Sequence, residues 1–442
     1  MLQKTIFTLI IFLAVSCGSE NKITVQNFEI FPFKNKYIVM GAIDNKRYYH
    51  SEQADEAIQW AADQLDNGGE IFLHKGKFFI KEEIALQSYI TLKGSGMGSE
   101  LIIDPDHNTG TGINIIGKDR IILKNFVIKS VKENNNSQNG IVLNDCGDCF
   151  IDGIYIVGMK KNGILLNNKT FLSEVTNCRI AACEGSAIRF ENLTGQGRGG
   201  DFVPNNISNC IIYQGNYGIS CSHAIVANIS DVTVYQSKNI AFYLTKTSNS
   251  VLITGCRTFQ IQDDAVVVEN SHEINISSNI FCWTEGNGIV LNGVKWGTVS
   301  ANNVIDNGSI NPFDPKKDSL RTTQEVKQTL RSAEHRKSVK SGIVVKNMTK
   351  GVTITGNAVF NWPATPKMRY GIVEDSSCQN NNIISNNINF YSIADVHSEG
   401  IGTKVMGNVG FGEVPYTGNI GIAGVQAFNL QLMENFINDI WN

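Results

Sequence analysis

Residues 253–291 read ITGCRTFQIQDDAVVVENSHEINISSNIFCWTEGNGIVL and contain two copies of one short unit. Each copy has an Ile-Ser/Thr segment, a corner, and then a small residue followed by three apolar positions. The first copy leads from Ile253 to Val266 and the second from Ile276 to Ile289, so matched residues are 23 apart. An internal repeat constrains the architecture of a chain more than any other sequence feature.

The apolar residue that follows the small residue recurs through most of the chain, with gaps of 23, 24, 31, 23, 24, 23, 54 and 29 residues. These marker residues are Ile141, Ile164, Ile188, Ile219, Phe242, Val266, Ile289, Ile343 and Ile372. Each is preceded by Gly or Ala, which indicates that a neighbouring segment passes close by.

A second column of residues has the same repeat, each member lying three residues after an Ile or Val. Its members are Cys178, Cys210, Cys256, Asn279, Asn302, Asn357, Asn387 and Asn408. In stacked strands such Asn side chains hydrogen bond to their copies above and below. The segments between the columns alternate apolar and polar residues and are too short for helices. We therefore predict an all-β, right-handed parallel β-helix, because a propeller blade needs about twice this period.

Residues 1–17 have the composition of an export signal. Lys4 precedes an apolar run at 5–15, which is too short to span a bilayer as a stable helix. The ending Ala14-Val15-Ser16-Cys17 resembles a bacterial lipoprotein signal, which implies cleavage before Cys17 and a lipid on its thiol. The alternative is an ordinary secretory signal. Both predict export, either as an outer-membrane or cell-surface lipoprotein or as a secreted or periplasmic protein, with the lipid as the only membrane contact.

The remaining chain is expected to form one long domain. A lead-in at 18–50 precedes a solenoid at 51–412, and 413–442 forms a helical C-terminal cap. Residues 54–65 are predicted to form a helix that covers the first coil, since Ile58, Ala61 and Leu65 share one face. The net charge of −3 argues against nucleic acid as a partner, and the oligomeric state is left open.

The ten cysteines of this exported chain first suggest disulfides. The repeat argues otherwise, because three of them occupy the interior column, where a thiol packs as a small hydrophobic group. Cys146-Gly147-Asp148-Cys149 has redox spacing but lies at a predicted coil corner. No Cys/His cluster has zinc spacing and no acidic trio is typical of calcium, so neither a metal nor a cofactor is expected.

Residues 57–96, AIQWAADQLDNGGEIFLHKGKFFIKEEIALQSYITLKGSG, resemble the opening of the pectate lyase-like β-helix superfamily. That opening consists of a helix, Gly-Gly, a strand, Gly-x-aromatic, another strand and a Gly-x-Gly turn. The resemblance implies the fold but leaves the activity open, because the superfamily contains hydrolases, lyases, epimerases and non-enzymes.

Three inserts interrupt the repeat at 194–201, 306–341 and 361–369, and we expect all three to project from one edge of the solenoid. Inserts on one face often mark a binding face. Residues 314–340 contain eight Lys/Arg and four Asp/Glu, which is compatible with a lid over an anionic polymer or with a solvated helix.

The corners at 263–264 and 285–287 are the predicted catalytic positions, with Asp263, Asp264 and Glu285 as the carboxyl groups that glycoside hydrolysis needs. Cys256-x6-Asp263-Asp264 followed by Glu285-Gly-Asn287-Gly resembles the core of the polygalacturonase family. That resemblance implies Asp263 or Asp264 as acid/base residues. The chain departs from the family at Gln262 and Asn287, where the family has Gly and His. It also lacks the Asn-Thr-Asp motif near 238–244 and an Arg-x-Lys clamp, for which Lys346 is a lone candidate.

Two alternatives remain open beside an acidic-polysaccharide hydrolase. A lyase acting by β-elimination would use Lys340, Arg369 and Tyr370, with His397 as another possible base. A non-catalytic carbohydrate-binding or surface structural protein would use exposed aromatic rings. The rings considered are Tyr213, Tyr217, Tyr235, Tyr243, Trp283 and Trp362. The predicted substrate-binding residues are Asn287, Lys340, Arg369, Tyr370, Trp362 and Tyr243.

Overall fold

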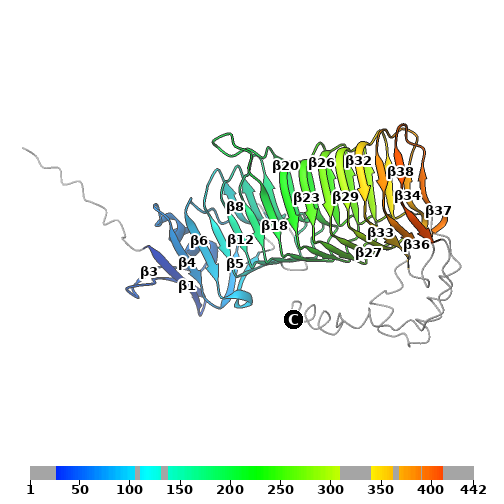
Figure 1. The fold of residues 1–442 in the computed structure, drawn as a ribbon. Helices are drawn as coiled ribbons and strands as arrows, with labels where there is room; N and C mark the ends of the chain where they lie inside the picture. The colour runs from blue at the N-terminus through cyan, green and yellow to red at the C-terminus, as the bar shows by residue number, and fades with distance from the viewer. Residues whose placement is uncertain are drawn as a thin grey trace, which may run out of the picture.

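The computed structural model describes residues 26–104, 110–130, 138–308, 340–361, 368–389 and 391–411. These residues form a right-handed parallel β-helix, as predicted, whose coils stack from the N-terminal to the C-terminal end (Figure 1). The predicted export signal at 1–17, Trp362 and the predicted C-terminal cap at 413–442 lie outside the described residues, as does most of the basic insert. None of the described helices is long and apolar enough to cross a membrane.

Three sheets, here called A, B and C in the order in which each coil visits them, run along the solenoid. Sheet A contains β1 (Asn27–Phe33), β2 (Lys36–Gly41), β3 (Arg47–Ser51), β4 (Gly69–Leu73), β6 (Ile90–Gly94), β9 (Ile122–Lys124), β12 (Phe150–Asp152), β15 (Glu174–Thr176), β18 (Asn205–Ser208), β23 (Asn249–Thr254), β26 (His272–Ser277), β29 (Lys295–Ser300), β32 (Lys350–Thr355), β35 (Asn382–Ile384) and β38 (Lys404–Met406). Sheet B contains β5 (Gly76–Ile80), β7 (Ser99–Ile103), β10 (Val127–Ser130), β13 (Tyr155–Val157), β16 (Arg179–Ala181), β19 (Ile211–Tyr213), β21 (Thr233–Tyr235), β24 (Arg257–Phe259), β27 (Ile280–Thr284), β30 (Asn303–Asn307), β33 (Ala358–Phe360), β36 (Asn387–Asn389) and β39 (Val409–Phe411).

Sheet C contains β8 (Thr111–Ile116), β11 (Asn139–Asn144), β14 (Asn162–Asn167), β17 (Ser186–Leu193), β22 (Phe242–Thr245), β25 (Val266–Glu269), β28 (Ile289–Asn292), β31 (Ile343–Lys346), β34 (Met368–Glu374) and β37 (Tyr391–Ser398). The long strand β20 (Tyr217–Ser230) begins in sheet C and ends in sheet A. We name the three corners of each coil by the sheets that they join: A–B, B–C and C–A.

The marker residues all lie in sheet C and pair with one another in sequence order. Ile141 pairs with Ile164, and the same register continues without a slip through Val266 and Ile289 to Ile372. The predicted register is therefore confirmed. Because side chains alternate between the two faces of a strand, this register places one apolar residue per coil in the interior.

Close backbone approach explains the small residue before each marker. A Cβ added to Gly163 would lie 2.6 Å from the carbonyl oxygen of Ala187 in the next coil, and one added to Gly342 would lie 2.7 Å from that of Gly371. These distances are too short for a Cβ, so at Gly163 and Gly342 any side chain would force the backbone or the neighbouring coil to shift.

An interior ladder of amides lies at the A–B corner. Asn279 Nδ2 donates to Asn302 Oδ1 at 2.9 Å, and Asn302 Nδ2 donates to Asn357 Oδ1 at 2.9 Å. Cys256 precedes them in this column, and its backbone N–H donates to Asn279 Oδ1. The prediction that these residues share one column is confirmed.

One member of the predicted column was wrong. Asn386, and not Asn387, accepts from Asn357 Nδ2 at 2.9 Å and donates to Asn408. Asn387 is the exposed first residue of β36. Ile383 and Ile384 are consecutive, so counting three residues onward from the second of them produced the error of one position.

The described cysteines are all free and buried. Cys146 and Cys149 lie at the C–A corner between β11 and β12, as expected of a coil corner. In the interior column, Cys178 Sγ donates to the Thr176 carbonyl oxygen at 3.2 Å and Cys210 Sγ donates to that of Ser208 at 3.2 Å. These thiols act as packed interior groups.

The N-terminal end is built from both the lead-in and the helix. β1 pairs in parallel with β4 and extends sheet A, while β2 and β3 continue it in antiparallel order. The helix α1 (Ala54–Asp63) is two residues shorter than expected and buries Ala57, Ile58 and Ala61. β1, a strand of the lead-in, thus occupies the edge of the first coil in sheet A.

The inserts do not share one edge, so that prediction was wrong. Residues 308–342 and 361–367 join strands of sheet B to strands of sheet C and leave from the B–C corner. Residues 194–204 instead join β17 in sheet C to β18 in sheet A, at the C–A corner. Gap lengths between markers in sheet C could not separate these cases, because one gap spans all three corners.

Candidate functional site

The B–C corner brings together most of the predicted site residues, on four successive coils. Asp263 and Asp264 precede β25, and Glu285 and Asn287 precede β28. Lys340 precedes β31 on the third coil, and Arg369 and Tyr370 lie on β34 of the fourth. Since stacked strands are about 4.8 Å apart, corners of neighbouring coils lie within reach of one sugar ring.

Asp264 is held by the next coil. Its Oδ1 accepts hydrogen bonds from the backbone N–H of Asn287 and, at 3.0 Å, from Asn287 Nδ2. A Cβ on Gly286 would lie 2.3 Å from this oxygen, so the absence of a side chain there lets the carboxyl pack against the backbone. Within the described residues, Oδ2 makes no hydrogen bond, which leaves one carboxyl oxygen for other chemistry.

Burial raises the pKa of the Asp264 carboxyl above its ordinary value, and the charge of Asp263 raises it further. The two hydrogen bonds from Asn287 and the positive charge of Lys340 oppose this shift without cancelling it. Desolvation disfavours the charged form of a carboxyl, so Asp264 retains its proton to a higher pH than a solvated aspartate does.

The other two predicted carboxylates occupy more open positions. Asp263 is half-buried, and its backbone carbonyl accepts from the Gly286 N–H at 3.2 Å. Glu285 is exposed, and its backbone N–H donates to the Ile261 carbonyl at 2.8 Å. The corner therefore combines one desolvated carboxyl with two that reach solvent, on two adjacent coils.

Asn287 continues a polar column across the corner. Its Oδ1 accepts from the backbone N–H of Ser341 at 2.9 Å, while its Nδ2 donates to Asp264. Two coils of the N-terminal half show the same arrangement, since Asn162 Nδ2 donates to Asn139 Oδ1 at 3.0 Å. Asp264 therefore also has a structural function, because it takes the position of an amide in such a column.

Basic and aromatic groups occupy the C-terminal part of the corner. The guanidinium of Arg369 lies over the Tyr370 ring, 5.3 Å from its centroid. Tyr370 stacks on His397 with centroids 5.2 Å apart and planes at 21°. His397 Nε2 lies 3.1 Å from Glu399 Oε1. The backbone N–H of Arg369 donates to the Lys340 carbonyl at 2.7 Å, so these coils are in direct contact.

Tyr243 lies on the outer face of sheet C, near the corner residues but not among them. Its hydroxyl donates to Glu269 Oε2 at 2.7 Å, and Asn292 Nδ2 donates to Glu269 Oε1 at 3.2 Å. Tyr243 also stacks on Tyr217 with centroids 5.8 Å apart. Sequence reasoning missed Glu269, although its place three residues after the marker Val266 defines the face on which it lies.

The remaining aromatic residues gather on a different face. Tyr213 stacks on Tyr235 at 5.4 Å, and Tyr235 stacks on Phe259 at 5.3 Å. Trp283 follows at 6.1 Å from Phe259. This column belongs to sheet B, whereas Tyr217 and Tyr243 lie in sheet C, so the aromatic residues considered as sugar platforms do not form one surface.

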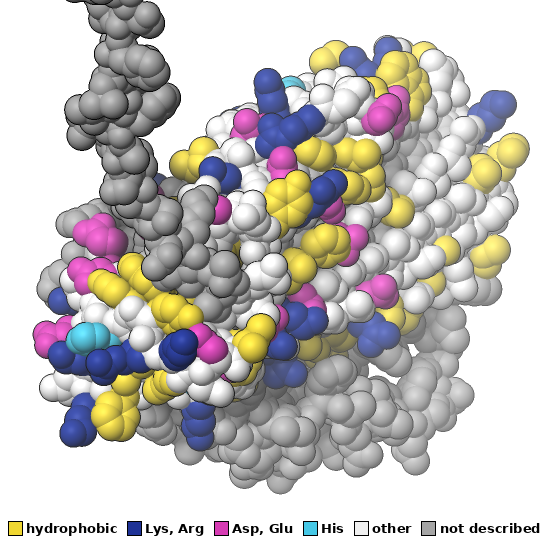
Figure 2. All heavy atoms as spheres, turned by 90° about the vertical axis from the view of Figure 1, so that its left-hand side faces the viewer, with side chains coloured by type: hydrophobic (Ala, Val, Ile, Leu, Met, Phe, Trp, Pro, Cys, Tyr) yellow, Lys and Arg dark blue, Asp and Glu magenta, His cyan; other side chains and the backbone are white. Residues whose placement is uncertain are grey.

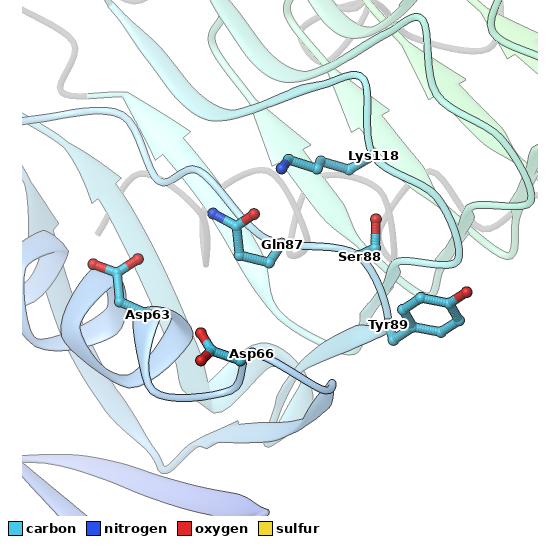
Figure 3. Close-up of a pocket in the computed structure, with 6 residues that line it drawn as sticks. All are labelled: Asp63, Asp66, Gln87, Ser88, Tyr89 and Lys118. Atoms are coloured by element: carbon cyan, nitrogen blue, oxygen red, sulfur yellow. The ribbon is translucent and has the colours of Figure 1, made fainter. Parts of the chain in front are cut away.

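A pocket of about 430 Å³ lies far from this corner, at the N-terminal end of the solenoid (Figure 3). It is lined by Asp63, Asp66, Gln87, Ser88, Tyr89 and Lys118. None of these residues was singled out from the sequence, because they come from the end of α1 and from two C–A corners. Across the part of the chain that the structure describes, no three His, Cys, Asp or Glu side chains gather as a metal site.

Comparisons with known proteins show the fold. No family model matches the chain, and no curated protein matches it. Among solved structures, the A-module of Azotobacter vinelandii mannuronan C-5 epimerase AlgE6 is similar, with a TM-score of 0.62 and 12% identity over 82% of this chain and 96% of that one. Tailspike protein 3 of bacteriophage CBA120 has a TM-score of 0.58 and 13% identity, covering 82% and 60%. PfbA, a surface adhesin of Streptococcus pneumoniae, has a TM-score of 0.53 and 13% identity over 78% of this chain and 87% of that one.

Proposed function

We propose that this protein is an exported, polysaccharide-active β-helix whose B–C corner hydrolyses glycosidic bonds of an acidic polysaccharide. One fold is shared by an epimerase of mannuronan, a phage tailspike protein and an adhesin, so the fold is compatible with this proposal but does not choose among activities. The residues of the corner carry the argument.

The observation that carries the proposal is the environment of Asp264. Glycoside hydrolysis needs one carboxylic acid that protonates the leaving oxygen and one carboxylate that acts as base or nucleophile. Asp264 has a raised pKa and one oxygen anchored by Asn287, which suits the acid. Asp263 and Glu285, which are more open to solvent, suit the second role.

The basic residues define the proposed substrate class. Lys340 and Arg369 lie one and two coils beyond Asn287 along the same corner. A polymer that lies along the corner, with its scissile bond at Asp264, would place neighbouring sugars beside them. Carboxylates on those sugars would pair with the ammonium and guanidinium groups, and Tyr370 would support a sugar ring.

The test is incubation of the protein with acidic and neutral polysaccharides, with reducing ends and unsaturated products measured in parallel. New reducing ends without unsaturation are expected. Asp264→Asn retains the acceptor for the Asn287 N–H and should lower the rate by about 10²–10⁴-fold. Asp375→Asn is the matched control, because Asp375 also accepts backbone N–H groups, from Asn347 and Ser377, but at a C–A corner. Equal rates in both variants would refute the acid role.

A lyase is the second candidate, and the group formed by Arg369, Tyr370 and His397 favours it. β-Elimination needs a cation beside the uronate carboxylate and a group that removes a proton from the sugar ring. Arg369 supplies the cation, while Tyr370 and His397 supply groups that transfer protons. Unsaturated products that disappear in Tyr370→Phe and persist in Asp264→Asn would select this activity over hydrolysis.

Export as a lipoprotein is part of the proposal and rests on Ala14-Val15-Ser16-Cys17. Labelled palmitate should enter the wild-type protein and not Cys17→Ala. Equal labelling of the two proteins, or no labelling of either, would refute lipidation and favour an ordinary secretory signal.

A further inference from the structure

The pocket at the N-terminal end of the solenoid is built from three separate segments. Asp63 ends α1 and Asp66 follows it, Gln87, Ser88 and Tyr89 precede β6, and Lys118 lies at the next C–A corner. In Figure 3 the side chains of Gln87 and Lys118 extend toward the part of the pocket that contains Asp63, and Tyr89 lies at the opposite rim. Its volume of about 430 Å³ is large enough for one or two sugar rings.

Hydrogen bonds and ion pairs fix the corner that carries Lys118. The Asp119 backbone N–H donates to Ser88 Oγ at 3.0 Å. The Asp119 carboxylate accepts two hydrogen bonds from Arg198, at 3.1 and 3.0 Å. Arg198 belongs to the insert at 194–204, and its guanidinium also lies 5.8 Å from the Phe171 ring centroid. Through Arg198 the insert fixes Asp119, the residue that follows Lys118, and so stabilises this wall of the pocket.

The rim formed by Tyr89 is fixed in the same way. Arg120 donates to the Tyr89 hydroxyl at 3.3 Å, lies 5.5 Å from its ring centroid and pairs with Asp148 at 3.2 Å. The backbone of Tyr89 is left-handed, with φ of 68°, and a Cβ on Gly68 would lie 2.6 Å from the Tyr89 Cβ. Tyr89 remains 55% exposed, so a fixed aromatic ring faces solvent. Rigid walls lower the entropy lost when a ligand binds.

The electrostatics of the pocket favour a cation. Two carboxylates stand against one ammonium group, and both carboxylates lie at the C-terminal end of α1. The C-terminal end of a helix carries partial negative charge, which basic side chains usually offset. The last turn of α1 contains no basic residue. Figure 2 shows acidic and basic side chains interspersed over this end of the molecule.

We propose that this pocket binds an amino-sugar residue of a glycan, at a site distinct from the B–C corner. The ammonium group of the sugar pairs with Asp63 and Asp66 at the end of α1. Its hydroxyl groups hydrogen bond to Gln87, Ser88 and Lys118, and the sugar ring or its neighbour packs on Tyr89. The pocket thus selects a cationic glycan, whereas the B–C corner with Lys340 and Arg369 selects an anionic one.

The test is calorimetric titration of the whole protein with three tetrasaccharides, of glucosamine, N-acetylglucosamine and galacturonic acid. The glucosamine tetramer is expected to bind most tightly, with an affinity that falls as salt increases. Asp63→Asn should weaken its binding at least about tenfold, because it removes the charge from one charge-assisted hydrogen bond. Tyr89→Ala should also weaken the binding of the glucosamine tetramer, because it removes the ring on which the sugar packs.

Asp231→Asn is the matched control, since Asp231 is an exposed aspartate at an A–B corner far from the pocket. It should bind the glucosamine tetramer like the wild type. The proposal is overturned if no heat of binding is detected, if Asp63→Asn and Asp231→Asn bind equally, or if the acidic tetramer displaces the glucosamine tetramer. Because binding is measured without turnover, failure here is independent of the activity proposed for the B–C corner.

Discussion

Replacing Asn302 by Ala tests whether the amide ladder stabilises the solenoid. Asn302 is 1% exposed, and its side chain makes four hydrogen bonds. Its Nδ2 donates to the carbonyl of Ile276 and to Asn357 Oδ1, and its Oδ1 accepts from the backbone N–H and Nδ2 of Asn279, all at 2.9–3.1 Å. Ala removes all four.

The expected loss follows from that count. A net contribution of about 1 kcal/mol for each hydrogen bond gives a loss of about 4 kcal/mol in the free energy of unfolding. The buried backbone N–H of Asn279 is left without its acceptor, so the loss of stability should lie at the upper end of the range seen for single substitutions. Cys256→Ala is the matched control one coil before Asn279. Its Sγ makes only long contacts, at 3.4 and 3.7 Å, so the loss there should be about 1 kcal/mol.

Urea unfolding followed by circular dichroism measures both variants, with the m-value used to check that the same surface is exposed. Equal midpoints for Asn302→Ala and Cys256→Ala would show that apolar packing, and not the amide ladder, holds the A–B corner together. A change in the m-value of Asn302→Ala alone would show that the C-terminal coils unfold separately.

Three further substitutions test other parts of the structure. Gly371→Ala would place a Cβ 2.1 Å from Ile388 Cγ2 and should cost about 1–3 kcal/mol, whereas Gly215→Ala, with its nearest atom at 3.3 Å, should be near neutral in thermal melts. Glu374→Leu should lower the melting temperature, because this fully buried carboxylate accepts three side-chain hydrogen bonds whose donors would lose their acceptor; an unchanged melting temperature would contradict this. The folded state raises the pKa of Asp264 above the ordinary value of about 3.9 for an unfolded chain. The folded protein should therefore lose stability as the pH rises from that ordinary value through the raised pKa. Thermal melts at a series of pH values should show this loss in the wild type and not in Asp264→Asn.

The sequence by itself determined the solenoid and its register. The 23-residue unit repeats because every coil must place one apolar residue of sheet C in the interior and one small residue against the next coil. Such a pattern is local and periodic, so it can be counted along the chain. Asn279 and Asn302 were assigned to one column on the same ground, and the error at Asn387 arose only where two isoleucines are adjacent.

The repeat in the sequence also predicted that the carboxylates of the B–C corner lie along the same edge as Lys340, Arg369 and Tyr370. All of these residues lie next to the marker in their own coils, and stacked coils align whatever lies at one position of the repeat. What each residue does there was not readable from spacing. The Asn287 bonds to Asp264 and the burial that raises its pKa depend on the coil above, not on the residues beside Asp264 in the chain.

Only the tertiary structure showed at which corner of the coil each insert lies and where the N-terminal pocket is. Arg198 meets Asp119 across 79 residues, and Lys118 faces the end of α1 across two coils. Arg198 and Asp119 both lie at C–A corners, but Arg198 belongs to an insert that no other coil has. The pocket likewise depends on the path of a terminal helix that does not repeat. Periodicity predicts what every coil shares, whereas a site that occurs once is set by packing between segments that differ from one another.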